Sequence, residues 1–358
     1  MALIVMKMST MAILTIVIGL VVMVPVIMIL IDEVFPKERD DSEFTWSDSR
    51  GNIRAIEWEP KGDRIAVIND WDEKGGDGEE HFLKIWNHSS KRTETVIENS
   101  DKFHYFETLS WSPDGLMLAV FCVDSTNHTD SHLPWIISSV PKVRIFNTTT
   151  WRVVTTLEDN ISYMTTLDWN WDGTILAGTD VGWDVSSTLM FWNTQTWTMA
   201  FRTKEAAITT MEWSPTSDAL AVGHKDGNIT IYNTTIVPIQ RFKAHYSPVR
   251  ALAWNPNGSL LLSGASEEIV LWNTEDWSST GLRSSSDYGM VTMIDWNGDG
   301  SRIAVVNEDI IMIMTPSELR EQESLVGHHD WITGLSWSHH NHRIATVDQE
   351  GNVKFWKV

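Results

Sequence analysis

The chain has 358 residues, with 48 acidic and 27 basic side chains and a net charge of −21 at pH 7. Binding to a phosphate backbone or an anionic lipid surface needs the opposite sign of charge, so the composition excludes nucleic acid as a partner and favours a basic one. Cys122 is the only cysteine, which excludes an intrachain disulfide.

The first predicted element is an apolar segment near the amino terminus. Residues 8–31 run for 24 residues without a charged side chain. As a helix this segment is about 36 Å long, enough to span a hydrocarbon core of about 30 Å. We predict a transmembrane signal anchor in residues 1–31 and an acidic juxtamembrane linker in residues 32–42. A cleaved signal peptide is the alternative, but the apolar length exceeds the usual range of about 7–15 residues and no small-x-small site follows.

This anchor predicts a single-pass membrane protein. Lys7 on one flank and Lys37 and Arg39 on the other leave the charge bias nearly balanced, so the orientation rests on the position of the segment. A terminal anchor that precedes a domain acts like an export signal, which predicts an extracytoplasmic location for that domain. Seven Asn-x-Ser/Thr sequences agree with export. Tight turns select the same residues, and turn chemistry is the simpler explanation.

The rest of the chain repeats one pattern seven times. An apolar run closes on a tryptophan, and then come a turn of Pro, Asn, Asp or Gly, a second apolar run and an aromatic residue followed by Asn. Successive tryptophans are separated by 53, 58, 44, 41, 42 and 41 residues. Alternating hydrophobicity predicts that each repeat forms a four-stranded antiparallel meander, with strands a to d. The anchoring tryptophans are Trp58, Trp111, Trp169, Trp213, Trp254, Trp296 and Trp337.

Such a sheet cannot bury both of its faces alone, so the units must stack and close radially. On this repeated pattern the chain resembles the WD40 family of β-propellers over residues 43–358. The resemblance implies an all-β, seven-bladed β-propeller, preceded here by one N-terminal transmembrane helix. The last repeat ends after its third strand, "NVKFWKV". We therefore predict that residues 43–49 supply its missing outer strand.

The chain departs from the family pattern at the polar positions. The Gly-His pair survives as Gly327 and His328 and, loosely, at His245, while the usual turn aspartate is plain only at Asp226 and repeat seven has Glu350 instead. On this basis we predict that no repeat carries the family's full buried network of His, Ser or Thr, Asp and Trp.

The connections between strands predict a functional surface. In a closed ring of meanders, all b–c and d–a connections lie on one face, the b–c/d–a face, and all a–b and c–d turns lie on the other, the a–b/c–d face. Three neighbouring b–c connections are much longer than a tight turn: residues 69–82, 124–141 and 180–187. Short turns suffice to make the fold, so these loops mark the b–c/d–a face as the candidate site.

Aromatic residues concentrate on the connections of this face. Tryptophan and tyrosine dominate the hot spots of protein interfaces because they bury a large rigid area at little entropic cost. The alternative is that the loop tryptophans fold back and only stabilise their own loops. The predicted partner-binding residues are Trp71, Trp135, Trp183, Tyr246, Tyr288 and Trp331.

Metal and catalytic signatures are weak. The acidic loop at residues 69–82 lacks EF-hand spacing, and Asp124, His128, Asp130 and His132 form a second weak metal candidate, so we predict no metal and no cofactor. Phosphate-binding loops, nucleophile elbows and paired-His zinc helices are absent from the sequence. We predict a non-catalytic, membrane-anchored scaffold that binds a protein or peptide through the b–c/d–a face. An extracytoplasmic propeller enzyme, or a small-ligand or metal-binding domain, is the alternative.

Overall fold

A computed structural model describes residues 40–47, 52–70, 82–98, 103–126, 138–159, 161–181, 186–340 and 342–358. Contacts divide the chain into two units, Met1–Asp40 and Asp41–Val358. The description below concerns the second unit, whose described residues form strands and turns without a helix.

The predicted localisation, a single-pass membrane protein with an extracytoplasmic domain, is wrong. In the part of the chain that the structure describes, no helix is long and apolar enough to cross a membrane. The predicted anchor, residues 8–31, lies outside the described residues.

The described residues form 26 strands. In chain order they are β1 (Phe44–Ser47), β2 (Asn52–Trp58), β3 (Arg64–Asp70), β4 (Phe82–Asn87), β5 (Arg92–Glu98), β6 (Phe103–Trp111), β7 (Met117–Thr126), β8 (Ser138–Asn147), β9 (Val153–Leu157), β10 (Met164–Trp169), β11 (Ile175–Val181), β12 (Ser186–Asn193), β13 (Thr198–Ala206), β14 (Ile208–Trp213), β15 (Leu220–His224), β16 (Asn228–Tyr232), β17 (Pro238–Lys243), β18 (Ala251–Trp254), β19 (Leu260–Asn273), β20 (Ser279–Trp296), β21 (Ile303–Asn307), β22 (Ile310–Met314), β23 (Glu321–Leu325), β24 (Ile332–Trp337), β25 (Arg343–Asp348) and β26 (Asn352–Lys357).

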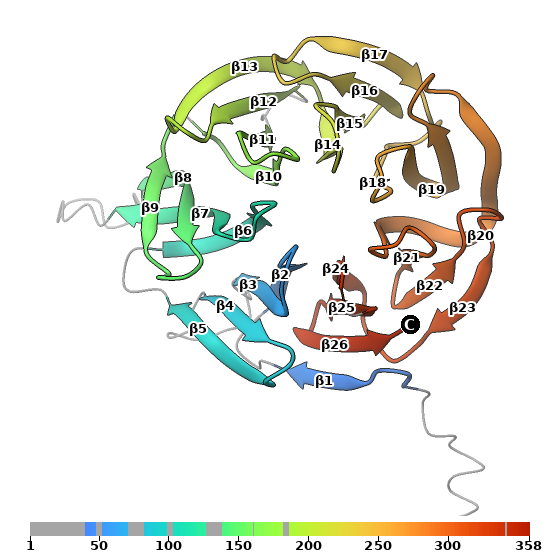
Figure 1. The fold of residues 1–358 in the computed structure, drawn as a ribbon, viewed down its shortest axis with the longest axis horizontal. Coiled ribbons are helices and arrows are strands. Elements are labelled where there is room, and N and C mark those ends of the chain that lie inside the picture. The colour runs from blue at the N-terminus through green and yellow to red at the C-terminus, as the bar shows by residue number, and fades with distance from the viewer. Residues whose placement is uncertain are drawn as a thin grey trace, which may run out of the picture. The chain divides into compact units, whose positions relative to one another are not determined.

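These strands form antiparallel sheets arranged in a ring (Figure 1). Four sheets are simple meanders in chain order, β2 to β5, β6 to β9, β10 to β13 and β14 to β17. The first strand of each sheet lies next to the ring axis and the last lies at the rim (Figure 1). Alternating side chains of the inner strands are buried between neighbouring sheets, which explains why the sequence shows one apolar run for each strand.

One sheet is longer than the others and has the order β18-β19-β20-β21-β22-β23. The first half of β20 pairs with β19, from Ser279 opposite Trp272 to Ser285 opposite Glu268. The second half of β20 pairs with β21, from Val291 opposite Asn307 to Trp296 opposite Ile303. A single long strand therefore serves as the outer strand of one repeat and the inner strand of the next.

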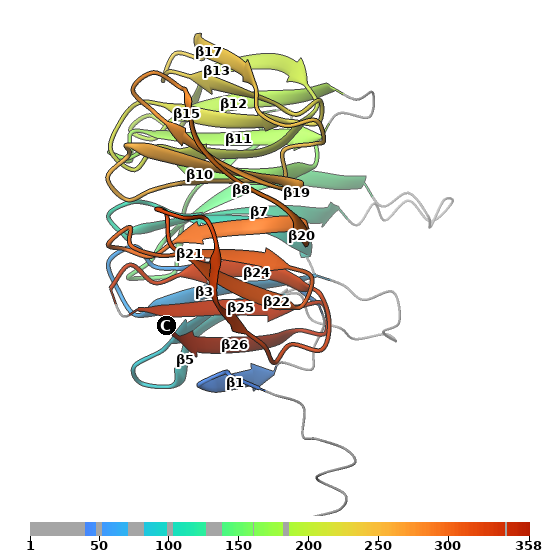
Figure 2. The same cartoon turned by 90° about the vertical axis from the view of Figure 1, so that its right-hand side faces the viewer.

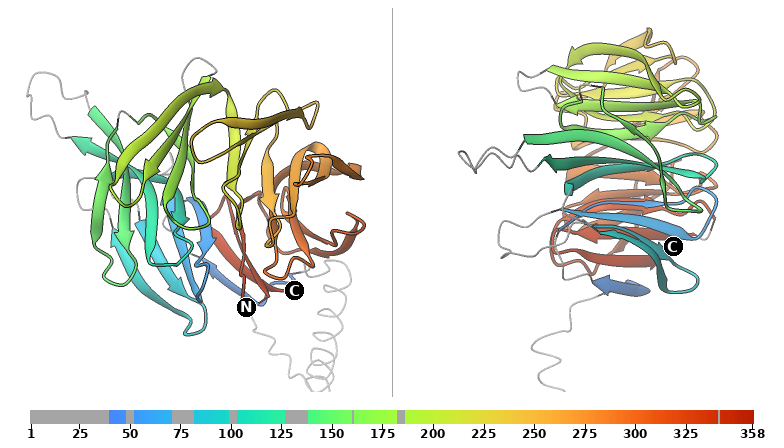
Figure 3. Two further views of the ribbon diagram at one scale, coloured as in Figure 1. Left: turned by 45° about the horizontal axis from the view of Figure 1, so that its top comes forward. Right: turned by 90° about the vertical axis from the view of Figure 1, so that its left-hand side faces the viewer.

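The predicted amino-terminal clasp is confirmed. The last sheet has the order β1-β26-β25-β24, and Phe44 lies opposite Phe355 in an antiparallel register. The half-buried Trp46 stacks on Trp86 of the neighbouring sheet, with 5.5 Å between the ring centroids. In the side views of Figures 2 and 3, β1 lies beside β26 at the rim. The clasp therefore joins the two ends of the ring through backbone pairing and aromatic packing.

Three tryptophans in c–d turns have a structural role. Trp151, Trp197 and Trp277 adopt left-handed backbone conformations, with φ of 54°, 56° and 57°. Each ring packs edge to face on the anchoring tryptophan of its own sheet, at centroid distances of 6.2, 6.0 and 5.8 Å. These contacts compensate for the strained backbone and account for part of the chain's high tryptophan content.

The prediction that no repeat carries the full polar network is also wrong. In the last sheet Trp356 Nε1–H donates to Thr346 Oγ1 at 2.7 Å. His328 Nε2 bonds the same hydroxyl at 2.7 Å, and His328 Nδ1 bonds Asp348 Oδ2 at 2.7 Å. All four side chains are buried. Burial favours the neutral form of Asp348, but hydrogen bonds from His328 and Asn352 outweigh it and lower the pKa of this carboxyl.

A second, variant network lies in the sheet that begins with β18. His245 Nε2 bonds Ser263 Oγ at 2.7 Å, and Trp272 Nε1–H donates to the same oxygen at 2.8 Å. The carboxylate comes from Glu268, whose Oε2 lies 2.9 Å from His245 Nδ1. This acid lies in the second half of β19, whereas Asp348 lies at the end of β25.

Candidate functional site

The inner strands all run in the same direction, which fixes the two faces of the ring. Trp111 N–H donates to Glu57 Oε1 at 3.3 Å, linking the ends of the first two inner strands at one level. Trp213 N–H is bonded to Asp168 in the same way, and Trp58 N–H donates to Ser336 Oγ of the last sheet at 3.0 Å. The starts of the inner strands, with the d–a connections before them, therefore share the b–c/d–a face.

The structure describes two of the six predicted partner-binding side chains. Tyr246 is 97% exposed and Trp331 is 47% exposed, and both lie on d–a connections of the b–c/d–a face. They stand on separate connections, two repeats apart along the chain. Tyr288 lies within β20, but its side chain is outside the described part of the structure, as are Trp71, Trp135 and Trp183. Whether the loop tryptophans fold back remains a prediction.

The Tyr246 connection is fixed at its base while the tyrosine projects outward. His245 N–H donates to Gly227 O at 3.0 Å, and the His245 ring is held in the buried network. Val249, on the other side of the connection, is fully buried, and its N–H donates to His224 O at 3.2 Å. A side chain on a tethered backbone loses little entropy when a partner covers it.

Charge on the described part of this face is mostly negative. The basic side chains on or next to its described connections are Arg54, Lys204, Lys225, Lys243 and Arg250. The acidic side chains that keep some exposure there are Glu158, Asp159, Glu205, Asp226, Glu268, Glu308, Asp309, Asp330 and Glu350.

Sequence reasoning missed four acidic side chains around the ring axis. Each comes directly before an anchoring tryptophan, and they are Glu57, Asp168, Glu212 and Asp295. Asp168 Oδ2 accepts the N–H of Trp213 at 2.6 Å, and Asp295 Oδ2 accepts the N–H of Trp337 at 2.6 Å. The signal is an acidic residue directly before the anchoring tryptophan in four of the seven repeats, a position where an alternating strand pattern also allows a polar side chain.

Burial raises the affinity of all four carboxyls for protons, and the two aspartates raise that of the two glutamates further. Burial raises the pKa of Asp168 and that of Asp295 to about 7, against the opposing effect of their backbone hydrogen bonds. Burial also raises the pKa of Glu57 and of Glu212 well above the usual value, and repulsion from the two aspartates adds to it. The cluster is therefore less charged near neutral pH than four exposed carboxyls would be, which reduces repulsion where the sheets meet.

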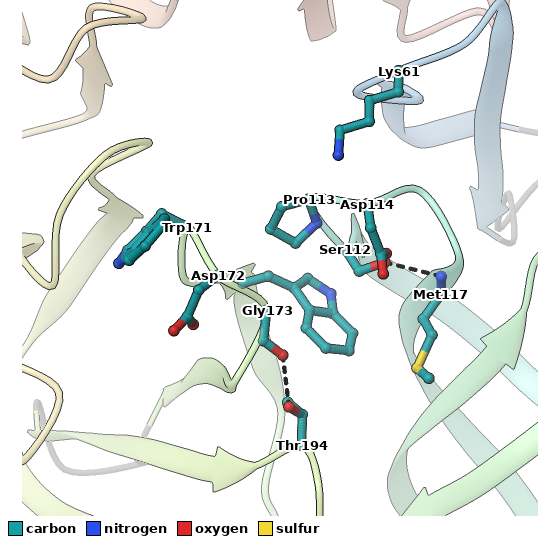
Figure 4. Close-up of a pocket in the computed structure, with 10 residues that line it drawn as sticks. Lys61, Ser112, Pro113, Asp114, Met117, Trp171, Asp172, Gly173 and Thr194 are labelled. Atoms are coloured by element: carbon teal, nitrogen blue, oxygen red, sulfur yellow. Dashed lines mark hydrogen bonds between the residues drawn. The ribbon is translucent and has the colours of Figure 1, made fainter.

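A pocket of about 240 Å³ lies on the a–b/c–d face, between the turns that follow β2, β6 and β10 (Figure 4). Its walls include Lys61, Pro113 and Trp171. The Trp171 ring is 46% exposed, and its Nε1–H donates to Asp218 at 2.9 Å. Asp172 Oδ1 accepts hydrogen bonds from its own turn, and Ser112 Oγ donates to Asp114. These carboxylates stabilise turns, and the pocket lining lacks a paired nucleophile and base.

The predicted metal candidates fall mostly outside the described residues. Asp124 is described, and it is buried and engaged by Arg144 at 2.8 Å and Lys142 at 3.2 Å. Among the residues that the structure describes, no group of three or more His, Cys, Asp or Glu side chains has an arrangement suited to a metal ion.

Comparison with known sequences identifies the repeats. A family model described as "WD domain, G-beta repeat" matches residues 195–233, 236–273 and 319–357. The chain is 22% identical over 295 residues to "Cell division cycle 20.1, cofactor of APC complex" of Arabidopsis thaliana, covering 78% of this chain and 60% of that protein. It is 21% identical over 164 residues to "SIR4-interacting protein SIF2" of Saccharomyces cerevisiae, covering 42% of this chain and 31% of that protein.

A solved structure agrees on the fold. A chain in "Crystal Structure of Mitotic Checkpoint Complex" matches with a TM-score of 0.69 and 18% identity, and the match covers 91% of this chain and 94% of that one. At this identity the likeness establishes the fold alone. The matched repeats, the buried His-Thr-Asp-Trp network and the ring of sheets lead to one conclusion: the chain contains WD40 repeats.

Proposed function

We propose that residues 43–358 form a seven-bladed propeller that acts as a non-catalytic scaffold and binds a protein or peptide through its b–c/d–a face. The blade number is supported by the seven anchoring tryptophans, with the six-stranded sheet counted as two blades. In this count β19 supplies the b and c strands of the first blade, and β20 supplies its d strand and the a strand of the second. The clasp strand β1 then completes the last blade.

The observation that carries the proposal is the projection of Tyr246 from a tethered connection. A tyrosine that is 97% exposed makes little contribution to its own fold, yet buried hydrogen bonds hold its backbone in place. Rigid exposed aromatic side chains are the usual anchors of protein interfaces. Trp331 repeats this arrangement, and we assign Trp71, Trp135, Trp183 and Tyr288 to the same surface.

The names of the relatives support a scaffold. One is named as a cofactor of the APC complex and another as an interacting protein of SIR4. Both names describe proteins that act in association with others. The chain spans 60% and 31% of these relatives, so their partners are not transferred to it.

A pair of matched variants tests the proposed face. The full chain, cross-linked in its source cells and purified, should bring a reproducible partner with it. Changing Tyr246 and Trp331 together to Ala should weaken binding of that partner by at least about 30-fold, because hot-spot truncations cost about 2 kcal/mol or more. Trp171→Ala, on the a–b/c–d face with nearly equal exposure, should leave binding unchanged.

Thermal unfolding of both variants separates binding from folding. The truncated side chains are exposed, so both variants should unfold within a few degrees of the wild type. A stable double variant that still binds the partner, together with loss of binding in Trp171→Ala, would move the interface to the a–b/c–d face.

A further inference from the structure

The surroundings of Trp331 differ from those of the other exposed aromatic side chains. Its N–H donates to Asp330 Oδ1 at 2.7 Å, and its carbonyl accepts the N–H of Gln349 at 3.0 Å. The next residue, Ile332, is buried and donates its N–H to Glu308 O at 2.8 Å. The backbone below the exposed indole is therefore tied to two b–c turns, one in its own sheet and one in the sheet before it.

Both of these turns carry acidic side chains. The turn between β21 and β22 has Glu308 and Asp309, and the turn between β25 and β26 has Glu350. Residues 307–310, 326–332 and 348–352 contain no Lys or Arg. Within the described part of the chain, none of the carboxylates of Glu308, Asp309, Asp330 and Glu350 forms a salt bridge. Arg54, at the start of β2, is a basic residue beside this surface, because Thr333 Oγ1 donates to the neighbouring carbonyl of Ile53 at 3.2 Å. The surface itself carries four acidic residues.

The other exposed aromatic side chains lack this setting. Tyr246 lies on a connection with Lys243 and Arg250 close in sequence, and its backbone is tied to the turn that carries Lys225. Trp171 shares its pocket with Lys61 (Figure 4). Asp226 stands next to Lys225, and Trp171 donates to Asp218, so both places mix acidic and basic side chains. The Trp331 connection instead adjoins two turns that carry acidic residues and no Lys or Arg.

Building on the proposed function, we propose that the surface formed by Trp331, Glu308, Asp309, Asp330 and Glu350 recognises a basic segment of the partner, with an arginine or lysine side chain placed over the Trp331 indole. A cation over an indole is attracted by the electron density of the ring. Carboxylates on both sides pair with the same cation and hold it in register. The acidic chain, with its net charge of −21, accelerates the approach of a basic segment.

Binding of a defined peptide to the full chain tests this proposal. The probe is a fluorescently labelled Gly/Ser peptide that carries arginines, and the control is the same peptide with citrulline, which keeps the shape and removes the charge. Fluorescence anisotropy should show binding of the arginine peptide that weakens as salt increases. The citrulline peptide should bind at least about tenfold more weakly, because it has neither the cation–π attraction nor the ion pairs.

Variants assign the binding to this surface. Trp331→Ala should weaken arginine-peptide binding about fivefold or more, and Trp331→Tyr should restore part of it, because tyrosine keeps an aromatic face. Glu308→Gln with Glu350→Gln should weaken binding and flatten its salt dependence. Trp171→Ala should change neither. Equal binding of the arginine and citrulline peptides, or full arginine-peptide binding by a folded Trp331→Ala variant, would overturn the proposal.

Failure of the proposed cation site can be distinguished from failure of the proposed function. If Trp331→Ala keeps full peptide binding but the Tyr246 and Trp331 double variant still loses the partner, the face is functional and the cation site is wrong. If the peptide binds as expected but the partner is retained by the double variant, the cation site stands and the partner docks elsewhere.

Discussion

Asp348→Ala should lower the free energy of unfolding by about 3–5 kcal/mol, because it removes one member of a buried, charge-assisted pair. The lost carboxylate accepts the hydrogen bond of His328 at 2.7 Å and caps the following turn by accepting the N–H groups of Glu350 and Asn352. The imidazole would remain buried with an unsatisfied donor. Equilibrium unfolding in urea measures the loss.

The control for this change lies two residues away. Glu350→Ala alters an exposed side chain on the same turn and should shift stability by no more than about 0.5 kcal/mol. If Asp348→Ala and Glu350→Ala have equal and small effects, the network in the last sheet contributes nothing specific to stability.

Changing both Asp168 and Asp295 to Asn should stabilise the protein above neutral pH. Burial raises the folded-state pKa of each carboxyl to about 7, above its usual value of 3.8. The folded state therefore binds more protons than the unfolded state between about pH 4 and 7, and this contribution to stability is lost as the pH rises through the folded pKa. Asparagine carries no charge and keeps an oxygen for one of the two tryptophan N–H groups that each carboxyl accepts. Its NH2 group replaces the second acceptor, which adds a cost that does not depend on pH.

The size of the effect follows from the pKa shifts. Each shift of about three units corresponds to at most about 4 kcal/mol of unfolding free energy. Because the carboxyls in the cluster are coupled, their contributions do not add, and we expect the double variant to gain at least about 2 kcal/mol. The melting temperature of the variant minus that of the wild type should rise from pH 5 to about pH 7 and then level off. Using the difference removes the contribution of other groups, such as Asp348. Parallel curves for the two proteins would mean that the carboxyls are ionised throughout this range.

The sequence was sufficient to predict the repeat, the meander and the clasp. The tryptophan spacing reflects the length of one sheet, and the missing outer strand after "NVKFWKV" required a strand from elsewhere, which β1 provides. The boundary between the outer strand of one repeat and the inner strand of the next was less visible, because β20 continues through both.

The polar network was missed because of a shift along the b–c turn. The turns "HKDGN" and "DQEGN" align His224 with Asp348 and Asp226 with Glu350. We expected the buried acid at the third position of the turn, where Asp226 is exposed and pairs with Arg241 at 3.2 Å. The buried acid of the last sheet stands at the first position. Residue type alone does not reveal which position faces the interior.

The candidate site was predicted only in part. Tyr246 and Trp331 were predicted because they are aromatic residues on d–a connections, and these residue types dominate interface hot spots. The acidic setting of Trp331 comes from two turns that are distant in sequence and meet only in the folded ring. The axial carboxyls likewise depend on contacts between neighbouring sheets, which a repeat pattern does not encode.

The most direct test of the functional face is footprinting of the partner-bound and free protein with a reagent that modifies exposed tryptophan and tyrosine. Trp331 on the b–c/d–a face and Trp171 on the a–b/c–d face are 47% and 46% exposed, so they react from equal starting points. We expect the partner to protect Trp331 and Tyr246 and to leave Trp171 unchanged. Protection of Trp171, with full reactivity of Trp331 and Tyr246, would contradict the proposed face.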